Sequence, residues 1–480
     1  MALPRSILSR ELLPASIAIF STIAIVAFEG LAVTAALPEL TAELGGVRLL
    51  PWVITAYLLA SGVTTAMAGS FIDALGSSTV FRWSTIGFAL FSLAAAAAPS
   101  MPVLVAARLF QGASGGAIVS VGLAAVALVY PGHLTGRALA ANSTVWGALG
   151  FAGPAIAALM LQVGSWRWIF LVMVPICLVA LVVGWRTLPG PVEHTPLTVD
   201  WLSAGLLVVT VGALLGAVSD IGASSWGFAA LTLVAGLLLW RRMGRHASPV
   251  LDRRFVARYP YLHLSAAASL TLAATLGLSA YLPVYIRGAR GGSASLAAWS
   301  VLWLTLGWTT SANVAGRVTD KISERTVLRI GALSGIPTVA AAWAAVAFSA
   351  PLPVIFAAYF AMGMTVGTVT NAALQIVRLA VADNLAGRAT SAHAFMRSLG
   401  VSVGAGVAGG VILAAVAASV SDIASVRAAL AGEATDLAGE AVAALDRGFT
   451  IAHGVSLVLI TVAAVAVHRL SHGPSFDRGS

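Results

Sequence analysis

The sequence is poor in charged residues. Only 9% of its 480 residues are charged, whereas 59% are hydrophobic and the mean hydropathy is +0.95. An ordinary soluble domain carries about 25% charged residues, so this composition excludes that class. The scarcity of charge indicates a polytopic membrane protein.

Cysteine and catalytic motifs are also scarce. The single cysteine, Cys177, lies inside an apolar segment, so neither a disulfide framework nor a cysteine metal site is available. The Gly-x-x-x-x-Gly-Lys-Ser/Thr loop of ATP-driven pumps is absent, and so are a His-Glu-x-x-His motif and a paired intramembrane Asp. We therefore expect a protein that is not an enzyme and that uses no cofactor and no metal.

The chain is rich instead in long apolar segments. A transmembrane helix needs roughly 20 consecutive apolar residues, and fourteen segments fit this requirement. The first segment, flanked by Arg5 and Arg10, ends without a cleavage pattern and is expected to stay as a membrane anchor. A twelve-span alternative requires the two segments between 201 and 241 to be peripheral or re-entrant. The fourteen segments are 14–37, 50–71, 80–98, 101–129, 138–162, 167–187, 201–220, 226–241, 261–286, 295–316, 327–349, 352–377, 389–417 and 448–468.

The distribution of basic residues supports an even number of spans. With both termini in the cytoplasm, 19 of the 27 basic residues fall in inside connections and six in outside ones, and Arg108 and Arg397 lie within spans. This bias follows the positive-inside rule. It also accounts for the net charge of +9 by topology and attraction to lipid, so we expect no nucleic-acid partner.

Two connections divide the spans into groups. Residues 189–200 are polar and rich in proline, and residues 241–258 form the most basic stretch. Two spans lie between these connections and six lie on either side. We therefore predict an all-α membrane protein with a six-helix bundle over 1–190, a two-helix linker hairpin over 191–245 and a second six-helix bundle over 246–480.

Glu29 lies in the middle of the first apolar segment. A charged side chain at that depth costs at least about 2.5 to 3.5 kcal/mol on insertion scales, so it usually faces a cavity or the bundle interior and has a function. A carboxyl group in such a setting can take up a proton at physiological pH. The alternative is a structural Glu29 that bonds to a backbone or hydroxyl group.

Arg108 places a permanent positive charge in the fourth segment. It needs an anion or carbonyl groups nearby, and Glu29 is the expected partner among the N-terminal spans. Protonation of Glu29 would release Arg108 and deprotonation would hold it, which makes the pair a candidate switch for proton coupling. The alternative is that Arg108 only braces the spans.

A series of short motifs follows the order of the segments. Three of them are FEGLAVTAALPEL (28–40), LVAARLFQGASGGA (104–117) and GFAGPAIAA (150–158). The first places Glu29 nine positions before Pro38. Together with SWRWIFLVMVPI (165–176), in which Met173 replaces a usual Asn, they resemble the fourteen-helix drug/proton antiporter branch of the major facilitator superfamily.

The resemblance implies a major facilitator fold of fourteen transmembrane helices. It also implies alternating access, in which the chain's kinked and closely packed helices let two bundles rock. The residues that match its conformational motifs in the fourth and fifth spans are Gln111, Gly112, Gly150, Gly153 and Pro154.

The loop between the second and third spans departs from the family pattern. GSFIDALGSS (69–78) keeps Gly69, Asp73 and Gly76, but three positions that are usually basic are Ala74, Ser77 and Ser78. We expect Arg82, one turn into the next span, to substitute as the partner of Asp73. The corresponding loop in the second half keeps Asp320 and Lys321.

Five further residues are candidates for a cavity or substrate site. Thr34 stands where the family commonly has Asn, and His393 and Arg397 lie four positions apart on one helical face. Trp146 and Trp303 either line a cavity or anchor helices at the membrane interface, which is the usual role of such residues.

These observations predict a proton-coupled exporter of hydrophobic, cationic or amphipathic small molecules in the inner (plasma) membrane. Its expected partners are the proton, the substrate and the lipid bilayer, and a monomer is expected. The alternatives are a lipid or amphiphile exporter on the same scaffold and a membrane sensor or binding protein that does not transport.

Overall fold

The structure is a computed structural model of the whole chain, and helices are the only regular elements among the residues that it describes. These residues are 6–36, 40, 43–44, 50–190, 200–219, 224–245, 250–292, 294–318, 322–382, 385–419 and 439–471.

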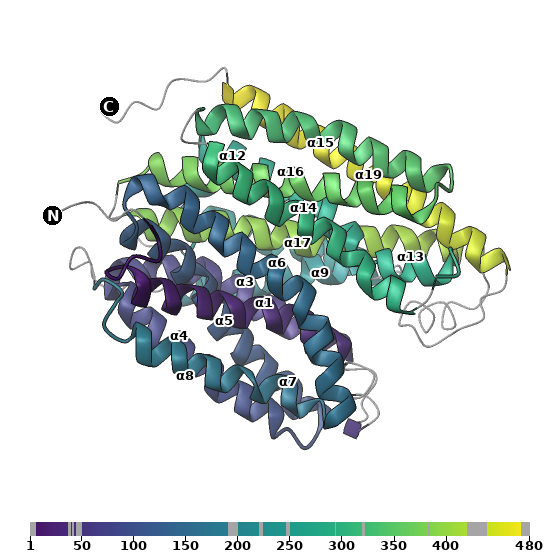
Figure 1. Ribbon diagram of the computed structural model, residues 1–480. Helices are drawn as coiled ribbons and strands as arrows, with labels where there is room; N and C mark the ends of the chain where they lie inside the picture. The colour runs from purple at the N-terminus through teal and green to yellow at the C-terminus, as the bar shows by residue number, and fades with distance from the viewer. Residues whose placement is uncertain are drawn as a thin grey trace. The chain divides into compact units, whose positions relative to one another are not determined.

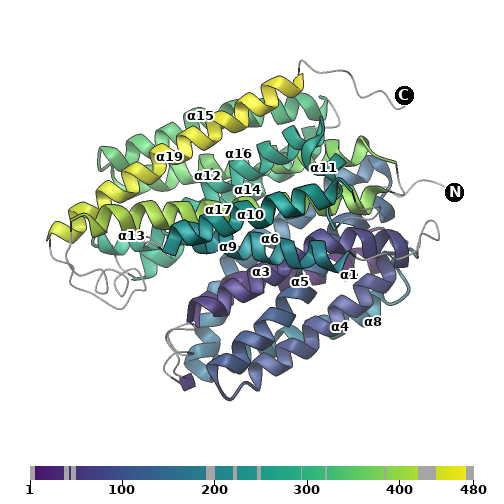
Figure 2. The ribbon, with the colours of Figure 1, turned by 180° about the vertical axis from the view of Figure 1, so that it is seen from behind.

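Every predicted apolar segment coincides with a long helix or with a pair of helices. In the first half these are α1 (Leu13–Ala35), α3 (Leu50–Leu75), α4 (Ser77–Ala96), α5 (Met101–Val129), α6 (Gly132–Val163), α7 (Arg167–Leu171) with α8 (Met173–Gly184), and α9 (Trp201–Ser219). In the second half they are α10 (Ser224–Met243), α12 (Tyr261–Ser279) with α13 (Leu282–Gly288), α14 (Ala294–Val318), α15 (Glu324–Ala347), α16 (Leu352–Leu379), α17 (Ala386–Ala417) and α19 (Gly439–Ser471). A short helix, α11 (Arg253–Ala257), precedes α12 (Figures 1 and 2).

Eleven spans among the described residues are long and apolar enough to cross a membrane. Helices α6, α10 and α14 are not among them, although each coincides with a predicted segment. The predicted all-α membrane fold is confirmed, and the helices agree in position with the predicted count of fourteen.

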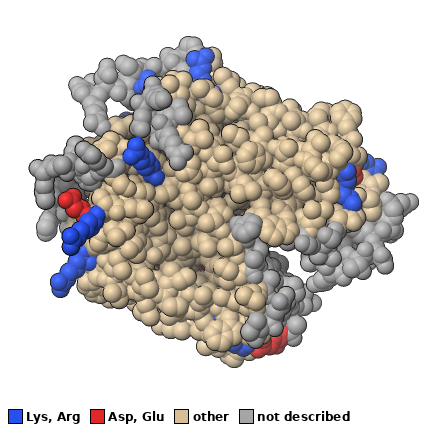
Figure 3. Space-filling view, viewed as in Figure 1, with Lys and Arg blue, Asp and Glu red and all other residues tan. Residues whose placement is uncertain are grey.

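The helix surfaces suit a lipid environment. Large apolar side chains are exposed on these surfaces. Examples are Val182, Trp226 and Phe348, each of which is at least 78% exposed. The described part of the face in Figure 3 carries only a few charged side chains. An exposed apolar surface of this extent is costly in water and favourable in a bilayer.

The chain forms two compact units. Unit 1 contains residues 1–208, 237–261 and 377–395, and unit 2 contains the remainder. The predicted boundaries at residues 190 and 245 stay a prediction.

In unit 1, α5 lies against both α3 and α4, and α1 lies against α6 and α8 (Figure 1). Glycine permits the approach of α5 to α3, because a Cβ atom at Gly112 would lie 2.3 Å from the carbonyl oxygen of Tyr57, and one at Gly116 2.1 Å from that of Ser61. Small residues at four-residue spacing allow such contact between membrane helices. This close packing fixes the position of Arg108, one turn before Gly112.

Unit 2 uses glycine in the same way. A Cβ atom at Gly363 of α16 would lie 2.0 Å from the carbonyl oxygen of Leu304 on α14, and one at Gly404 of α17 would lie 2.4 Å from Ala273 on α12. Helices α15 and α19 run side by side (Figures 1 and 2). The core of unit 2 therefore includes the middle of α19.

Candidate functional site

Glu29 and Arg108 form a buried ion pair in unit 1. Nη1 of Arg108 contacts Oε1 of Glu29, and the two side chains are only 2% and 1% exposed, respectively. They come from α1 and α5, which contact each other in this unit. The expected partnership is thus present in the structure, while the role of the pair in proton coupling stays a prediction.

Arg108 has further partners besides the carboxylate. Its Nε donates to the carbonyl oxygen of Val53 at 2.9 Å, and its Nη1 donates to Oε1 of Gln111 at 2.7 Å. The guanidinium carbon lies 4.3 Å from the ring centroid of Tyr57, a cation–π distance. Arg108 would therefore keep several contacts if Glu29 were neutral.

Gln111 holds the position of Arg108 from the next turn of α5. Because its Oε1 accepts from Arg108, its Nε2 is free to donate, and it donates to Oγ of Ser92 at 2.7 Å. The same Nε2 lies 3.8 Å from the sulfur of Met173, the residue that replaces the usual Asn. A thioether is a weak acceptor, so Ser92 is the principal partner of this amide.

The pair is enclosed by an apolar cluster. Phe28, Phe88, Ile118 and Phe170 are among its buried members. In such surroundings, removal of one partner leaves an uncompensated charge and typically costs about 3 to 5 kcal/mol. Glu29 avoids that cost only by staying paired or by taking up a proton.

Asp73, near the end of α3, meets the beginning of α17. Nε of Arg388 lies 3.4 Å from Oδ2 of Asp73, and the backbone N–H groups of Gly387 and Arg388 donate to the same side chain. The first N–H groups of a helix and its dipole both favour a negative charge at this place. Asp73 therefore has an anion site at a helix N-terminus.

Gly69 is needed for this contact. A Cβ atom at Gly69 would lie 2.8 Å from the carbonyl oxygen of Gly387, and a Cβ atom at Gly387 would lie 2.3 Å from Oδ1 of Asp73. Glycine is needed at position 76 for a different reason, because the φ angle of Gly76 is 80°, which lies in the region that favours glycine. All three family positions that survive in the loop thus have a physical role.

Arg82 differs from its expected role. Its Nε and Nη2 donate to the carbonyl oxygen of Trp185 at 3.0 and 2.6 Å, and its guanidinium lies 4.9 Å from the ring of that tryptophan. The predicted Asp73–Arg82 pair is replaced by Asp73–Arg388, because Arg82 lies on the side of α4 that faces the end of α8.

Ser77 and Ser78, which stand at two of the usually basic positions, bind the segment after α8. Oγ of Ser77 and the backbone N–H of Ser78 both donate to the carbonyl oxygen of Pro189, at 3.0 and 3.1 Å. Both serines are buried. The loop is therefore fixed by hydrogen bonds to a main-chain oxygen.

The other predicted site residues are dispersed. Trp146 packs at the edge of the apolar cluster around the ion pair, and His393 is buried at the start of α17. Trp303 is 39% exposed and stacks on Phe356 with a ring-centroid distance of 5.8 Å, while Nε of Arg397 is buried and has no hydrogen-bond partner among the residues that the structure describes. Thr34, Gly150, Gly153 and Pro154 lie on α1 and α6, but the side chains of Thr34 and Pro154 lie outside the described part, as do Asp320 and Lys321 entirely.

Two runs of the chain match the Gly-x-Ser-x-Gly pattern of hydrolases, at 112–116 and 400–404. Both lie inside helices, whereas a nucleophilic serine of this kind needs a strand-turn-helix elbow. Ser114 donates to the carbonyl oxygen of Phe110 and Ser402 to that of Ser398, each within its own helix. These runs serve helix packing.

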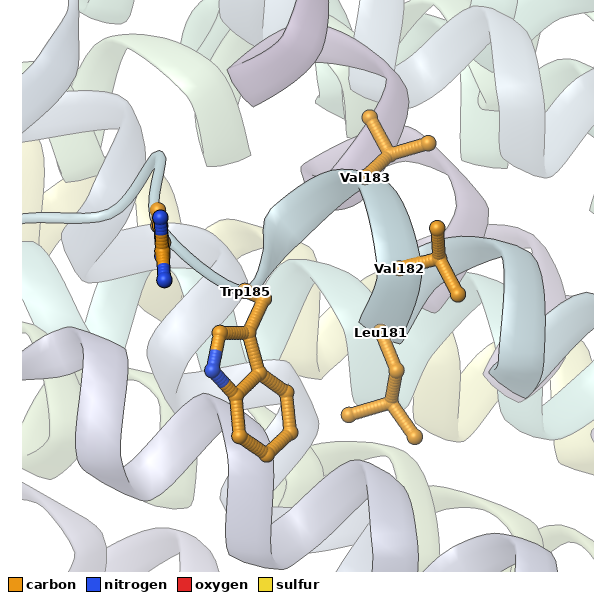
Figure 4. A pocket seen from close by; sticks show the side chains of 5 residues that line it. Leu181, Val182, Val183 and Trp185 are labelled. Atoms are coloured by element: carbon orange, nitrogen blue, oxygen red, sulfur yellow. The ribbon is translucent and has the colours of Figure 1, made fainter.

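A hollow on the surface of the molecule lies at the end of α8. It is lined by Leu181, Val182, Val183, Trp185 and Arg186 (Figure 4). Val182 is 80% exposed, so the hollow opens on the outer face of the helix. None of these residues belongs to the apolar cluster around Glu29 and Arg108.

Comparison with known proteins decides the family. The chain matches the model of the Major Facilitator Superfamily over residues 18–405. The chain belongs to this family. Its members are transporters and not enzymes, which confirms the prediction on catalysis, and their fold confirms the predicted architecture as a multi-pass membrane protein.

Individual major facilitator proteins resemble the chain over part of their length. A protein of Escherichia coli named "Uncharacterized transporter YebQ" is 32% identical over 56% of this chain and 61% of its own length. A "Probable multidrug-efflux transporter" of Mycobacterium tuberculosis is 35% identical over 44% of this chain and 47% of its own. The alignments thus span about half to three fifths of these relatives.

A solved structure agrees with the fold. The proton:xylose symporter XylE superposes with a TM-score of 0.64 over 95% of each chain. The sequence identity is 13%, so this likeness shows the fold alone.

Some residues of the site were not found from the sequence. Arg388 is 315 positions from Asp73 and carries no local signal for that pairing. Ser92 and Tyr57 are ordinary polar residues of apolar helices, and only the helix contacts bring them to Arg108 and Gln111. Helical periodicity along α4 is consistent with a buried position for Ser92, but it does not identify the partner of Ser92.

Proposed function

We propose that this major facilitator transporter exports hydrophobic, cationic or amphipathic small molecules in exchange for protons. It would work by alternating access in the plasma membrane, as a monomer with both termini in the cytoplasm. The observation that supports coupling is the buried Glu29–Arg108 pair. The names of relatives in multidrug efflux support the substrate class.

The pair offers two states of different charge. With Glu29 ionised, the site is neutral overall and Arg108 is held between α1 and α5. With Glu29 protonated, the attraction to α1 is lost, while Arg108 keeps the Val53 carbonyl, Gln111 and the Tyr57 ring on α3 and α5. A proton therefore changes the contact of α1 with its neighbours without leaving a bare cation.

Such a change can drive transport only if the two states favour different orientations of the cavity. We infer that the deprotonated pair favours one orientation and the protonated site the other. Proton binding would then favour one orientation of the cavity and proton release the other. The transporter would therefore carry protons and substrate across the membrane in opposite directions.

The test uses purified protein in proteoliposomes with a lipophilic cationic dye and an imposed pH gradient. Glu29→Gln fixes the neutral state, so uphill dye transport should be lost while downhill dye exchange persists. Glu43→Gln is the matched control, because Glu43 is a half-exposed carboxylate away from the pair. Full uphill transport by Glu29→Gln would refute proton coupling at this residue.

The same preparation separates the alternatives. A lipid exporter would move a fluorescent phospholipid between leaflets but leave the dye gradient unchanged. A sensor would bind the dye without moving it.

A further inference from the structure

A second buried polar cluster lies in unit 2, around His453 of α19. His453 is 0% exposed and lies near the middle of the apolar window Val442–Leu470. Ionisable side chains inside membrane helices are rare and usually mark a path for ions or protons. The residues that touch it show which protonation states it can adopt.

The contacts of His453 define its neutral tautomer. Nδ1 lies 2.7 Å from the carbonyl oxygen of Phe449. A carbonyl can only accept, so Nδ1 carries the hydrogen. In a neutral imidazole Nε2 then has a lone pair, and the hydroxyl of Tyr359, at 3.1 Å, must donate to it.

Protonation of His453 reverses the direction of one hydrogen bond. When Nε2 takes up a proton, it becomes a donor, and Tyr359 must turn its own hydrogen away and accept. The histidine gains one proton and one positive charge, and no covalent bond breaks. A hydrogen bond between Tyr359 of α16 and His453 of α19 can therefore form in both states.

A carboxyl group lies on the same face of α19, about two turns before His453. Asp446 is seven residues, or about two turns, before His453, and its Oδ1 is 3.1 Å from the hydroxyl of Tyr285. The ring of Tyr285 packs on Phe449 with a centroid distance of 4.7 Å. Nη1 of Arg290 donates to the same hydroxyl at 3.3 Å.

The neighbouring helices supply few other ionisable groups. Tyr285 comes from α13 and Tyr359 from α16, while α15 has its ionisable residues, Glu324, Arg325 and Arg329, in its first two turns. Helix α17, which meets α19 at Gly448, has none between residues 398 and 417. On α19 itself, Arg447 donates to Ser419, and His468 and Arg469 lie in the last turn.

We propose that His453, with Tyr359 and the Tyr285–Asp446 pair, is a second proton-binding site, separate from Glu29. It is loaded from the end of α19 at which Asp446 lies, and it adds a second proton to each transport cycle. This proposal rests on the proposed function, since it adds to the coupling at Glu29.

A spectroscopic test examines the proton directly. Protein labelled with 15N-histidine is placed in lipid nanodiscs, and the signal of His453 is assigned by its loss in His453→Gln. We expect the neutral form with hydrogen on Nδ1 at high pH and the imidazolium at low pH in the folded protein. Tyr359→Phe removes the donor to Nε2 and should move the midpoint. A signal that stays neutral at every pH at which the protein is folded would overturn the proposal.

A transport test measures stoichiometry with the membrane potential clamped at zero. With two protons per substrate, a tenfold proton gradient supports up to about a 100-fold substrate gradient, and with one proton about tenfold. We therefore expect His453→Gln to lower the limiting dye gradient from about 100-fold to about 10-fold. Ser456→Ala is the matched control, because Ser456 is a buried polar residue three positions later on α19.

The outcomes for the two sites are distinguishable. If Glu29→Gln still transports uphill, the proposed function fails. If Glu29→Gln is inactive but wild type and His453→Gln reach the same limiting gradient, only the second site fails, and His453 serves to join α16 and α19.

Discussion

Replacing Arg108 by methionine tests whether the buried pair is coupled as its geometry requires. Methionine keeps an unbranched side chain of similar length but removes the charge, so it leaves Glu29 ionised in an apolar cluster or forces it to bind a proton. Loss of one partner of a buried pair costs about 3 to 5 kcal/mol of unfolding free energy.

Glu29→Gln should cost less. Arg108 would keep the Val53 carbonyl, Gln111 and the Tyr57 ring, so only one charge-assisted contact is lost, worth about 1.5 to 3 kcal/mol. In the double variant no charge remains to be compensated. We expect it to be more stable than Arg108→Met alone, with an interaction free energy of about 1 to 3 kcal/mol.

The assay is equilibrium unfolding of the four proteins in lipid–detergent micelles at neutral pH. Arg82→Met is the matched control, because Arg82 binds the carbonyl oxygen and the ring of Trp185 and not a carboxylate among the described residues, so Glu29→Gln should not restore its stability. If the losses of unfolding free energy in the two single variants add up to the loss in the double variant, the reasoning is refuted. Arg108 and Glu29 would then stabilise the helices independently of each other.

Three further predictions concern other contacts. Asp73→Asn keeps the acceptor for the N–H groups of Gly387 and Arg388 but removes the charge, so dye transport should fall only modestly. Arg388→Gln should lower dye transport by the same amount. A complete loss of transport in one of the two variants alone would show that this residue acts through a contact other than the Asp73–Arg388 pair. Gly116→Ala should destabilise the protein by about 1 to 3 kcal/mol, because the new methyl group meets the Ser61 carbonyl, whereas Gly122→Ala, with no atom closer than 3.5 Å, should be nearly neutral in the same unfolding assay. Hydrogen bonds from Arg167 and Trp166 lower the pKa of Glu43 from its usual 4.5. These bonds therefore stabilise the folded protein above pH 4.5, and the stabilisation is lost as the pH falls through the lower pKa of the folded state. The difference in Tm between wild type and Glu43→Gln should vanish below that pKa, and a difference that is the same at every pH would contradict a role for the charge of Glu43.

The helices could be located from the sequence because apolar length alone determines a span. Helix α5 begins and ends at the predicted residues, and α19 begins nine positions before its predicted start, at Gly439, where alanine-rich sequence continues the helix beyond the apolar run. The Glu29–Arg108 pair was also predictable, since two opposite charges in adjacent apolar helices have few other partners.

The long-range partners of several other polar residues could not be predicted in the same way. Arg82 was expected to bind Asp73, yet the closer acceptor is a backbone oxygen at Trp185 that has no sequence signature. The sequence carries no local signal for His453, because its hydrogen-bond partner Tyr359 lies 94 positions earlier. Long-range pairing of this kind depends on helix contacts that hydropathy does not specify.

The attachment of the loop between α3 and α4 has a consequence for sequence change. Ser77, Ser78 and Arg82 all bind carbonyl oxygens, those of Pro189 and Trp185. Every residue type supplies a main-chain oxygen, so substitutions at 185 and 189 keep the acceptors, whereas loss of the hydroxyl or guanidinium removes a donor. Because the acceptors are neutral, salt should screen these hydrogen bonds little. The contact between the loop and the segment after α8 should therefore be about equally stable in dilute and in concentrated salt. For these hydrogen bonds, mutational sensitivity should therefore be concentrated at Ser77 and Arg82, whose side chains donate, because Ser78 donates through its backbone N–H.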